Sequence, residues 1–242
     1  MPRSEASSKA GRDHVSLADH AYYVIRERIL KGDVPLGAPL SRRRLAAELG
    51  MSLLPVAEAL QTLENDGLVE SRPRVGTRVC LPTPLEIRER YEVREALESH
   101  AARLYAQRAT TKQQRALDRM AAHLDAMFNR LTGETIQDRE FLYAVHSYHL
   151  QFHASIAEGT GCQTLRETIE KNHVLIFNWL FDVAASRPPL PPRFHRELAE
   201  ALNRGDVEIA DRAMRAHVRH GLETVAATVG SRARDIKFER VK

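Results

Sequence analysis

Two histidines one helical turn apart are the residues of this sequence most suited to chemistry. His149 and His153 occur in YAVHSYHLQFHASIAE, residues 143–158, on a helical face that also carries Phe152 and Ile156. Imidazole is a common ligand of transition metals and is otherwise unusual on an apolar face. The pattern therefore indicates either a metal site or histidines that are hydrogen-bonded within a core.

Two further histidines are also predicted to face inward. His195 comes just before the apolar pattern of Leu198 and Leu202, and His217 shares a helical face with Met214. Four inward imidazoles on three helices could converge on one ion. Three or four nitrogen ligands suit zinc or nickel. The alternative, in which each histidine is a core residue, stays open at this point.

Arg94 is a charged residue on a predicted apolar face. It shares that face with Tyr91, Leu97 and Ala101. An unpaired charge there would be costly. Arg94 therefore either pairs with Glu98, one turn along the helix, or awaits an anionic ligand.

Six arginines form two clusters in the first third of the chain. One cluster opens a predicted helix and the other flanks a predicted hairpin tip at Gly76. The clusters consist of Arg42, Arg43 and Arg44, and of Arg72, Arg74 and Arg78. Positive charge at a helix start and on a hairpin suits contact with DNA phosphates and insertion into the minor groove. The alternative is that these arginines only solubilise a small domain.

The elements that carry the arginines predict a winged helix-turn-helix. The expected order is a helix over 17–33, a turn over 35–40, a helix over 41–50 between Ser41 and Gly50, a helix over 51–67 capped by Ser52, and two short strands within 68–80. In such a motif the second helix of the helix-turn-helix enters the major groove of DNA. Ser52, Leu53 and Gly76 join the six arginines as candidate DNA contacts.

The rest of the chain predicts an all-helical bundle, so the fold class is mainly α. The expected helices cover 85–109, a segment from a capping box at Thr111 and Gln114 to Gly133, about 134–158, a helix capped at Thr160 and Gln163, a short helix between the break at 186–192 and Gly205, and a helix from Asp206 to about Val229. Bundles of this kind often hold a ligand between their helices.

Composition sets the broad class of the chain. Its 242 residues carry a net charge of +4 and only two cysteines, Cys80 and Cys162. No apolar run has the length of a membrane span, and the first residues do not form a signal peptide. We expect a soluble, cytoplasmic protein without a membrane partner. The expected parts are a flexible tail (1–14), the winged helix (15–80), the helical domain (84–230) and a basic C-terminal tail (231–242).

Residues 21–79 resemble the DNA-binding domain of GntR-family bacterial transcription regulators. The resemblance rests on PLGAPLS, LAAELGMS, PVAEAL, LENDGLVE and GTRV. It implies binding to a double-stranded DNA operator. The sequence departs from the family at Leu53 and Ala57, where arginines that face DNA are usual. We expect that the DNA sequence is recognised instead by Arg43, by the arginines of the predicted hairpin (the wing) and by contact of Leu53 with thymine methyl groups. The alternative is that DNA recognition is weak or directed at another class of sequence.

The helical part resembles the FCD effector domain that follows the winged helix in one GntR subfamily. The resemblance rests on VREALE, FHASIAE and HRELAEALNRGDVEIADRAMRAHV. Metal-binding members use an aspartate and three histidines, and the matching positions are His149, His153, His195 and His217. His149 replaces the usual aspartate, and His146 is a possible substitute there. The residue that matches Arg94 lines the effector pocket, which implies a small carboxylate effector held between Arg94 and the metal.

These features favour a ligand-responsive transcription regulator that is not an enzyme and that binds two half-sites as a homodimer. A histidine-metal-dependent hydrolase and a metal-sensing regulator without an organic effector are the alternatives. The sequence lacks an H-E-x-x-H motif and a recognisable nucleophile set. Four further histidines of the helical part, His100, His123, His173 and His220, are expected to be surface or core residues without a role in the site.

Overall fold

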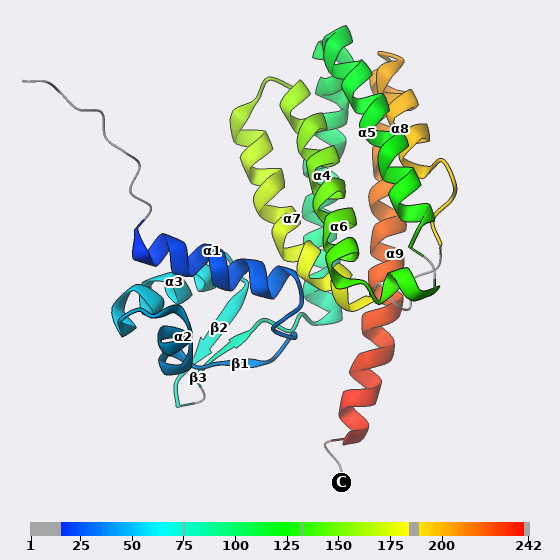
Figure 1. The fold of residues 1–242 in the computed structure, drawn as a ribbon. Helices are drawn as coiled ribbons and strands as arrows, with labels where there is room; N and C mark the ends of the chain where they lie inside the picture. The colour runs from blue at the N-terminus through cyan, green and yellow to red at the C-terminus, as the bar shows by residue number, and fades with distance from the viewer. Residues whose placement is uncertain (1–15, 75, 132, 184–188, 240–242) are drawn as a thin grey trace, which may run out of the picture.

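The computed structural model describes residues 16–74, 76–131, 133–183 and 189–239 (Figure 1). The N-terminal part is a winged helix-turn-helix, as predicted. Its elements are α1 (Leu17–Leu30), β1 (Pro39–Leu40), α2 (Arg42–Leu49), α3 (Leu53–Asn65), β2 (Val69–Arg72) and β3 (Gly76–Val79). The three strands form one antiparallel sheet in the order β1-β3-β2.

Local sequence explains how the helix-turn-helix begins and turns. The Ser41 side chain accepts a hydrogen bond from the backbone N–H of Arg44 and so caps α2. Gly50 ends α2 with φ of 64°, a left-handed conformation that favours glycine. Ser52 is the N-cap of α3, as predicted, but its side chain makes no capping hydrogen bond.

β1 is the element of this domain that the sequence did not predict. Residues 39 and 40 were expected to belong to a turn, but they pair with β3, Pro39 opposite Arg78 and Leu40 opposite Thr77. Two residues are too few to show an alternating pattern, and the partner strand lies far along the chain. Leu40 joins the buried core that α1 and α3 form over the sheet.

The second part is an all-helical bundle, which confirms the predicted architecture (Figure 1). Its helices are α4 (Pro84–Arg108), α5 (Thr111–Asn129), α6 (Arg139–Gly159), α7 (Gln163–Val183), α8 (Phe194–Asn203) and α9 (Val207–Glu239), with a 3-10 turn, η1 (Gly133–Ile136). The capping box that opens α4 is made by Thr83 and Glu86. Large buried side chains, among them Tyr91, Tyr105 and Phe152, fill the centre of the bundle.

Several predicted helix ends need correction. The capping box of α5 uses Thr110 and Gln113 rather than Thr111 and Gln114, because the doubled residues satisfy the spacing in two registers. α5 ends at Asn129 rather than at Gly133. Gly133 instead starts η1.

Two further boundaries differ from the prediction. α6 begins at Arg139 under an Asp138 cap, not near residue 134. α9 continues to Glu239, past the predicted end near Val229 and into the segment 231–242 that was expected to be a tail. The predicted tail over 1–14 and part of the break at 186–192 lie outside the described residues.

The two domains contact each other through α1, the end of α3, α6 and α7. Asp66, just after α3, accepts a hydrogen bond from the Tyr22 hydroxyl (2.7 Å) and lies 3.8 Å from the Lys171 ammonium of α7. Tyr143 of α6 packs against the winged-helix core, and Lys31 lies over its ring. In the part of the chain that the structure describes, no helix has the length and apolarity needed to cross a membrane.

Candidate DNA-binding face and buried histidine centre

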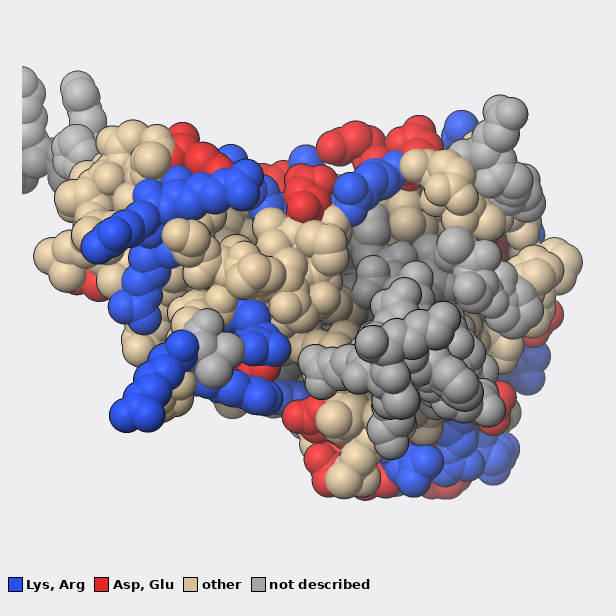
Figure 2. Space-filling view, turned by 90° about the horizontal axis from the view of Figure 1, so that it is seen from below, with Lys and Arg blue, Asp and Glu red and all other residues tan. Residues whose placement is uncertain are grey.

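Basic side chains gather over the winged helix on the face seen in Figure 2. The α2 arginines occupy its first turn, where the positive end of the helix dipole makes further positive charge unfavourable. Because this positive charge is unfavourable within the protein alone, these arginines are suited to binding an anionic partner.

The six predicted arginines are not equally available. Arg44 pairs with Glu48 at 2.7 Å, and Arg72 and Arg78 lie 3.1 and 3.7 Å from Glu70. The other three are exposed, and within the described ranges they make no ion pair with an acid; they are Arg42, Arg43 and Arg74. These three side chains are therefore the freest to bind phosphate.

Arg74 stands at the hairpin tip with φ of 65°. A hollow of about 450 Å³ separates the hairpin from the start of α2, and its lining includes Arg42, Arg72 and Gly76. The hollow thus places both arginine clusters around one concave surface. Ser52 and Leu53 lie exposed at the start of α3, beside this basic region in the helix-turn-helix. Contact of all these residues with DNA stays a prediction.

The histidine centre lies inside the helical domain. The His153 Nε2 atom is 3.0 Å from His149 Nε2 and 3.2 Å from His217 Nε2. The first two rings come from α6 and the third from α9. All three ligand nitrogens lie within 4.8 Å of one another. Three of the four predicted ligands are therefore brought together by the fold.

His195, from α8, lies beside this group rather than within it. Its ring centroid is 5.1 Å from that of His149 and 5.4 Å from that of His217. Its Nδ1 is 2.8 Å from an Asp125 carboxylate oxygen, and the same carboxylate accepts the backbone N–H groups of His195 and Arg196. A carboxylate bound to Nδ1 leaves Nε2 as the nitrogen with a lone pair, which is the usual arrangement of a metal-binding histidine.

Glu98 of α4 supports the centre from the other side. Its carboxylate lies 2.5 Å from Arg94 Nε, 2.5 Å from His173 Nε2 and 2.6 Å from His153 Nδ1. Arg94 Nη2 also lies 3.3 Å from His153 Nε2. Of the two alternatives that the sequence left open for Arg94, the structure shows the ion pair with Glu98. The second alternative, contact with an anionic ligand, stays a prediction, and Arg94 lies beside the histidines where such a ligand would bind.

The electrostatics of the centre keep the imidazoles neutral. Burial and the neighbouring His153 ring hold the pKa of His149 and of His217 well below the ordinary value. Burial lowers the pKa of His153 to about 3 despite the nearby Glu98. Burial would raise the pKa of Glu98, but Arg94 and the adjacent histidines hold it well below its usual range. Neutral imidazoles backed by an ionised carboxylate suit a cation.

The donor set also fits a metal ion. Because the Glu98 carboxylate binds Nδ1 of His153, the Nε2 of that ring carries a lone pair. Zinc–nitrogen bonds of about 2.0–2.1 Å in a tetrahedral site separate the nitrogens by roughly 3.4 Å. The observed 3.0 and 3.2 Å are close to that separation. As a whole residue His149 is half-buried, whereas His153 and His217 are buried.

Two residues of this centre were missed by the sequence analysis. His173 was expected to have no role, and Asp125 was not considered. Asp125 lies on the apolar face of α5 with Ala121 and Phe128, so the reasoning applied to Arg94 would have found it. His146, the possible substitute ligand, is buried but lies outside the close group of ligand atoms.

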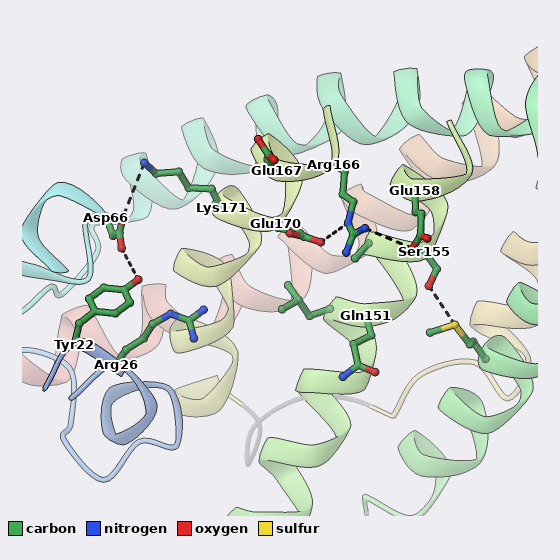
Figure 3. Close-up of a pocket in the computed structure, with 13 residues that line it drawn as sticks. Tyr22, Arg26, Asp66, Gln151, Ser155, Glu158, Arg166, Glu167, Glu170 and Lys171 are labelled. Atoms are coloured by element: carbon green, nitrogen blue, oxygen red, sulfur yellow. Dashed lines mark hydrogen bonds and ion pairs between the residues drawn. The ribbon is translucent and has the colours of Figure 1, made fainter. Parts of the chain in front are cut away.

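A second hollow lies on the outer side of α6, between the two domains (Figure 3). Its volume is about 630 Å³, and its lining includes Tyr22, Gln151, Arg166 and Lys171. Most of its charges are already paired, Arg166 with Glu170 of the same helix at 2.8 Å and Lys171 with Asp66 across the groove at 3.8 Å. His149 and His153 lie on the opposite side of α6, so this groove is separate from the histidine centre.

The fold and the two sites define a transcription factor with a winged-helix DNA-binding domain and a helical effector domain. The family model of the bacterial regulatory proteins of the gntR family matches residues 17–79, and that of the FCD domain matches residues 89–220. The chain therefore belongs to the GntR family and carries an FCD domain. It is a DNA-binding transcription regulator of this type.

Individual relatives agree with this assignment. The chain is 31% identical over 210 residues to a probable D-xylose utilization operon transcriptional repressor from Paenarthrobacter nicotinovorans, covering 86% of this chain and 88% of that protein. It is 27% identical to the repressor RspR from Escherichia coli K12, covering 84% and 86%. A GntR regulator from Rhodococcus sp. RHA1 has the same fold, with a TM-score of 0.69, 20% identity and coverage of 86% and 96%.

Proposed function

We propose that this regulator holds one divalent metal ion, zinc or nickel, in its helical domain. Its ligands would be His149, His153, His195 and His217. The observation that supports the proposal is the close approach of three Nε2 atoms, 3.0 and 3.2 Å from the central one, in a buried environment that keeps the rings neutral. Because two ligands come from α6 and the others from α8 and α9, the ion would also tie these helices together.

We further propose that a small carboxylate effector binds between the metal and Arg94. The Arg94 guanidinium lies 3.3 Å from Nε2 of His153, a proposed metal ligand, so one anion could contact both Arg94 and the metal ion. The metal would supply a Lewis-acidic contact for one oxygen, and Arg94 would donate hydrogen bonds to another. Glu98, which now binds Arg94 at 2.5 Å, would set its orientation.

A second function is sensing of the metal itself without an organic effector. The ion pair between Arg94 and Glu98 favours this second function, because Glu98 already neutralises the charge of Arg94 and accepts one of its hydrogen bonds. The two functions differ in what happens after metal loading. Only the first predicts that the loaded protein binds carboxylates and that Arg94→Ala removes this binding.

α7 offers a physical route from the centre to the DNA-binding domain. His173 on this helix binds Glu98. Two residues earlier, Lys171 lies 3.8 Å from Asp66, at the end of α3, which is the second or recognition helix of the helix-turn-helix. A ligand that shifts α7 would therefore alter the contact with the winged helix, in addition to any effect through the linker near Thr83. Such a change modulates DNA binding through different affinities in two states.

The proposal also includes a homodimer that binds two half-sites of an operator. GntR-family winged helices contact one half-site each, and a twofold dimer matches a near-palindromic operator. The effector would then change the relative placement of the two winged helices.

Metal analysis of the full-length protein tests the metal site directly. The freshly purified protein, or protein reloaded with zinc or nickel, should carry one ion per chain, and His153→Ala should abolish it. His100→Ala is the matched control, because His100 is a histidine of the same domain whose side chain is exposed. A wild-type protein that binds neither ion, measured by calorimetry, would show that the histidines are core residues.

A further inference from the structure

The first turn of the recognition helix α3 presents two leucines to solvent. Leu53 is 52% exposed and Leu54 is 67% exposed, although leucine is normally buried where a core is available. The leucines that follow in the same helix, Leu60 and Leu63, are buried in the winged-helix core. The exposed pair therefore belongs to the face of α3 that points away from its own domain.

This face of α3 carries no positive charge. The helix LLPVAEALQTLEN contains no lysine, arginine or histidine. Its other exposed side chains include Glu58 and Gln61. Guanine offers two acceptors to the major groove, O6 and N7, and arginine or lysine is the side chain that binds them best. A carboxylate such as that of Glu58 is repelled by the same acceptors.

Thymine is the base whose major-groove edge matches the exposed leucines. It is distinguished there by its C5-methyl group, which binds apolar side chains. The N-terminal residues of a recognition helix are those that reach base edges in a helix-turn-helix. The surrounding positive charge, with Arg42, Arg43 and Arg74 free of acidic partners among the described residues, complements the phosphates on both sides of such a base step.

We propose that Leu53 and Leu54 read thymine methyl groups in the major groove, so that each operator half-site places thymines under the start of α3. The inference rests on the proposed regulator binding specific DNA and names the bases that this helix selects. Leu54 is the new specificity-determining residue, and it is the more exposed of the two. Positioning on the duplex comes from the arginines, and base selection comes from the apolar turn.

Replacing thymine by uracil tests the proposal, because it removes only the methyl group. Full-length protein is first used to select duplexes from random DNA, which identifies the half-site. Duplexes with uracil at the thymines under α3 are then compared with the unmodified site by fluorescence anisotropy. Each lost methyl contact should weaken binding about fourfold, the factor that corresponds to burial of one methyl group. Uracil at flanking thymines should have no effect.

Leu54→Ala separates the methyl contact from other effects of uracil. Because Leu54 is mostly exposed, the variant should fold normally. It should lose sensitivity to uracil at the thymine that Leu54 contacts, keep the sensitivity that comes from Leu53, and keep its binding to phosphates. Leu85→Ala, at an exposed leucine of α4, is the matched control and should keep that sensitivity. Equal affinity of the wild type for uracil and thymine duplexes would overturn the proposal while leaving specific DNA binding intact. A failure to select any sequence would overturn specific DNA binding itself.

Discussion

Glu98→Gln should strongly destabilise the helical domain, because Glu98 is the anion on which the buried histidine centre depends. The side chains of Glu98 and Arg94 are 2% and 3% exposed, and their closest N–O distance is 2.5 Å. Glutamine keeps the size of the side chain but removes the charge, so the guanidinium loses its buried counter-ion. The amide also cannot accept all three neighbours as the carboxylate does.

The expected cost is about 3–5 kcal/mol of unfolding free energy, the range for breaking a buried ion pair from one side. Glu95→Gln is the matched control, one turn before Glu98 on the same helix. Glu95 pairs with Arg215 and Arg219 at 3.0 and 2.8 Å near the surface, where such pairs contribute about 0–1 kcal/mol. The difference between the two variants isolates the effect of burial.

Urea denaturation of the metal-free protein measures the effect. The single tryptophan, Trp179, lies in α7, so its fluorescence reports on the helical domain rather than on the winged helix. Arg94→Met combined with Glu98→Gln should recover part of the loss, since both charges are then removed together. If Glu98→Gln is no less stable than Glu95→Gln, Glu98 is not the charged centre of the network and the reasoning fails.

The remaining predictions concern DNA, metal, effector and assembly. Arg43→Ala and Arg74→Ala should each lower DNA affinity and reduce the salt dependence of binding by about one counterion, whereas Arg44→Ala should have a smaller effect because Glu48 already pairs with it. Asp125→Asn should weaken metal binding about 10–100-fold by calorimetry, since the carboxylate orients His195. His149→Asp should retain the metal and weaken the binding of dicarboxylates, because it adds negative charge. Light scattering should give twice the chain mass of 27.4 kDa, and a monomer that still binds a full operator would contradict the dimer.

Several helix caps could be predicted from local sequence, whereas a pairing made by distant segments could not. The caps at Ser41, Thr83 and Asp206 depend on residues within one helical turn, and the structure confirms them. β1 is two residues long and is defined only by its pairing with β3, so no local sequence pattern predicts it. The residues of the candidate sites divide in the same way, into those indicated by local sequence and those brought together by distant segments.

The convergence of the histidines was predictable only in part. An imidazole on an apolar face indicates that it points inward, which held for His153, His195 and His217. Which partner meets each ring depends on how helices pack, and the pattern does not contain that information. Asp125 comes from α5 to bind His195, and His173 comes from α7 to bind Glu98. The inward direction of these histidines can therefore be predicted from the chain, whereas the residues that surround and bind them need the structure.

The charge of this shell bears on what the proposed metal would bind next. Arg94 and Glu98 cancel, and so do Arg196 and Asp125, whose closest distance is 3.2 Å. With neutral imidazoles the centre has no net charge, so a divalent ion would leave two positive charges in a largely buried site. A buried charge of that size needs anionic partners. His149 stands where the metal-binding proteins that this domain resembles carry an aspartate, which would supply one negative charge. The proposed metal would therefore need more negative charge from its ligand here, and a dicarboxylate would meet that need better than a monocarboxylate.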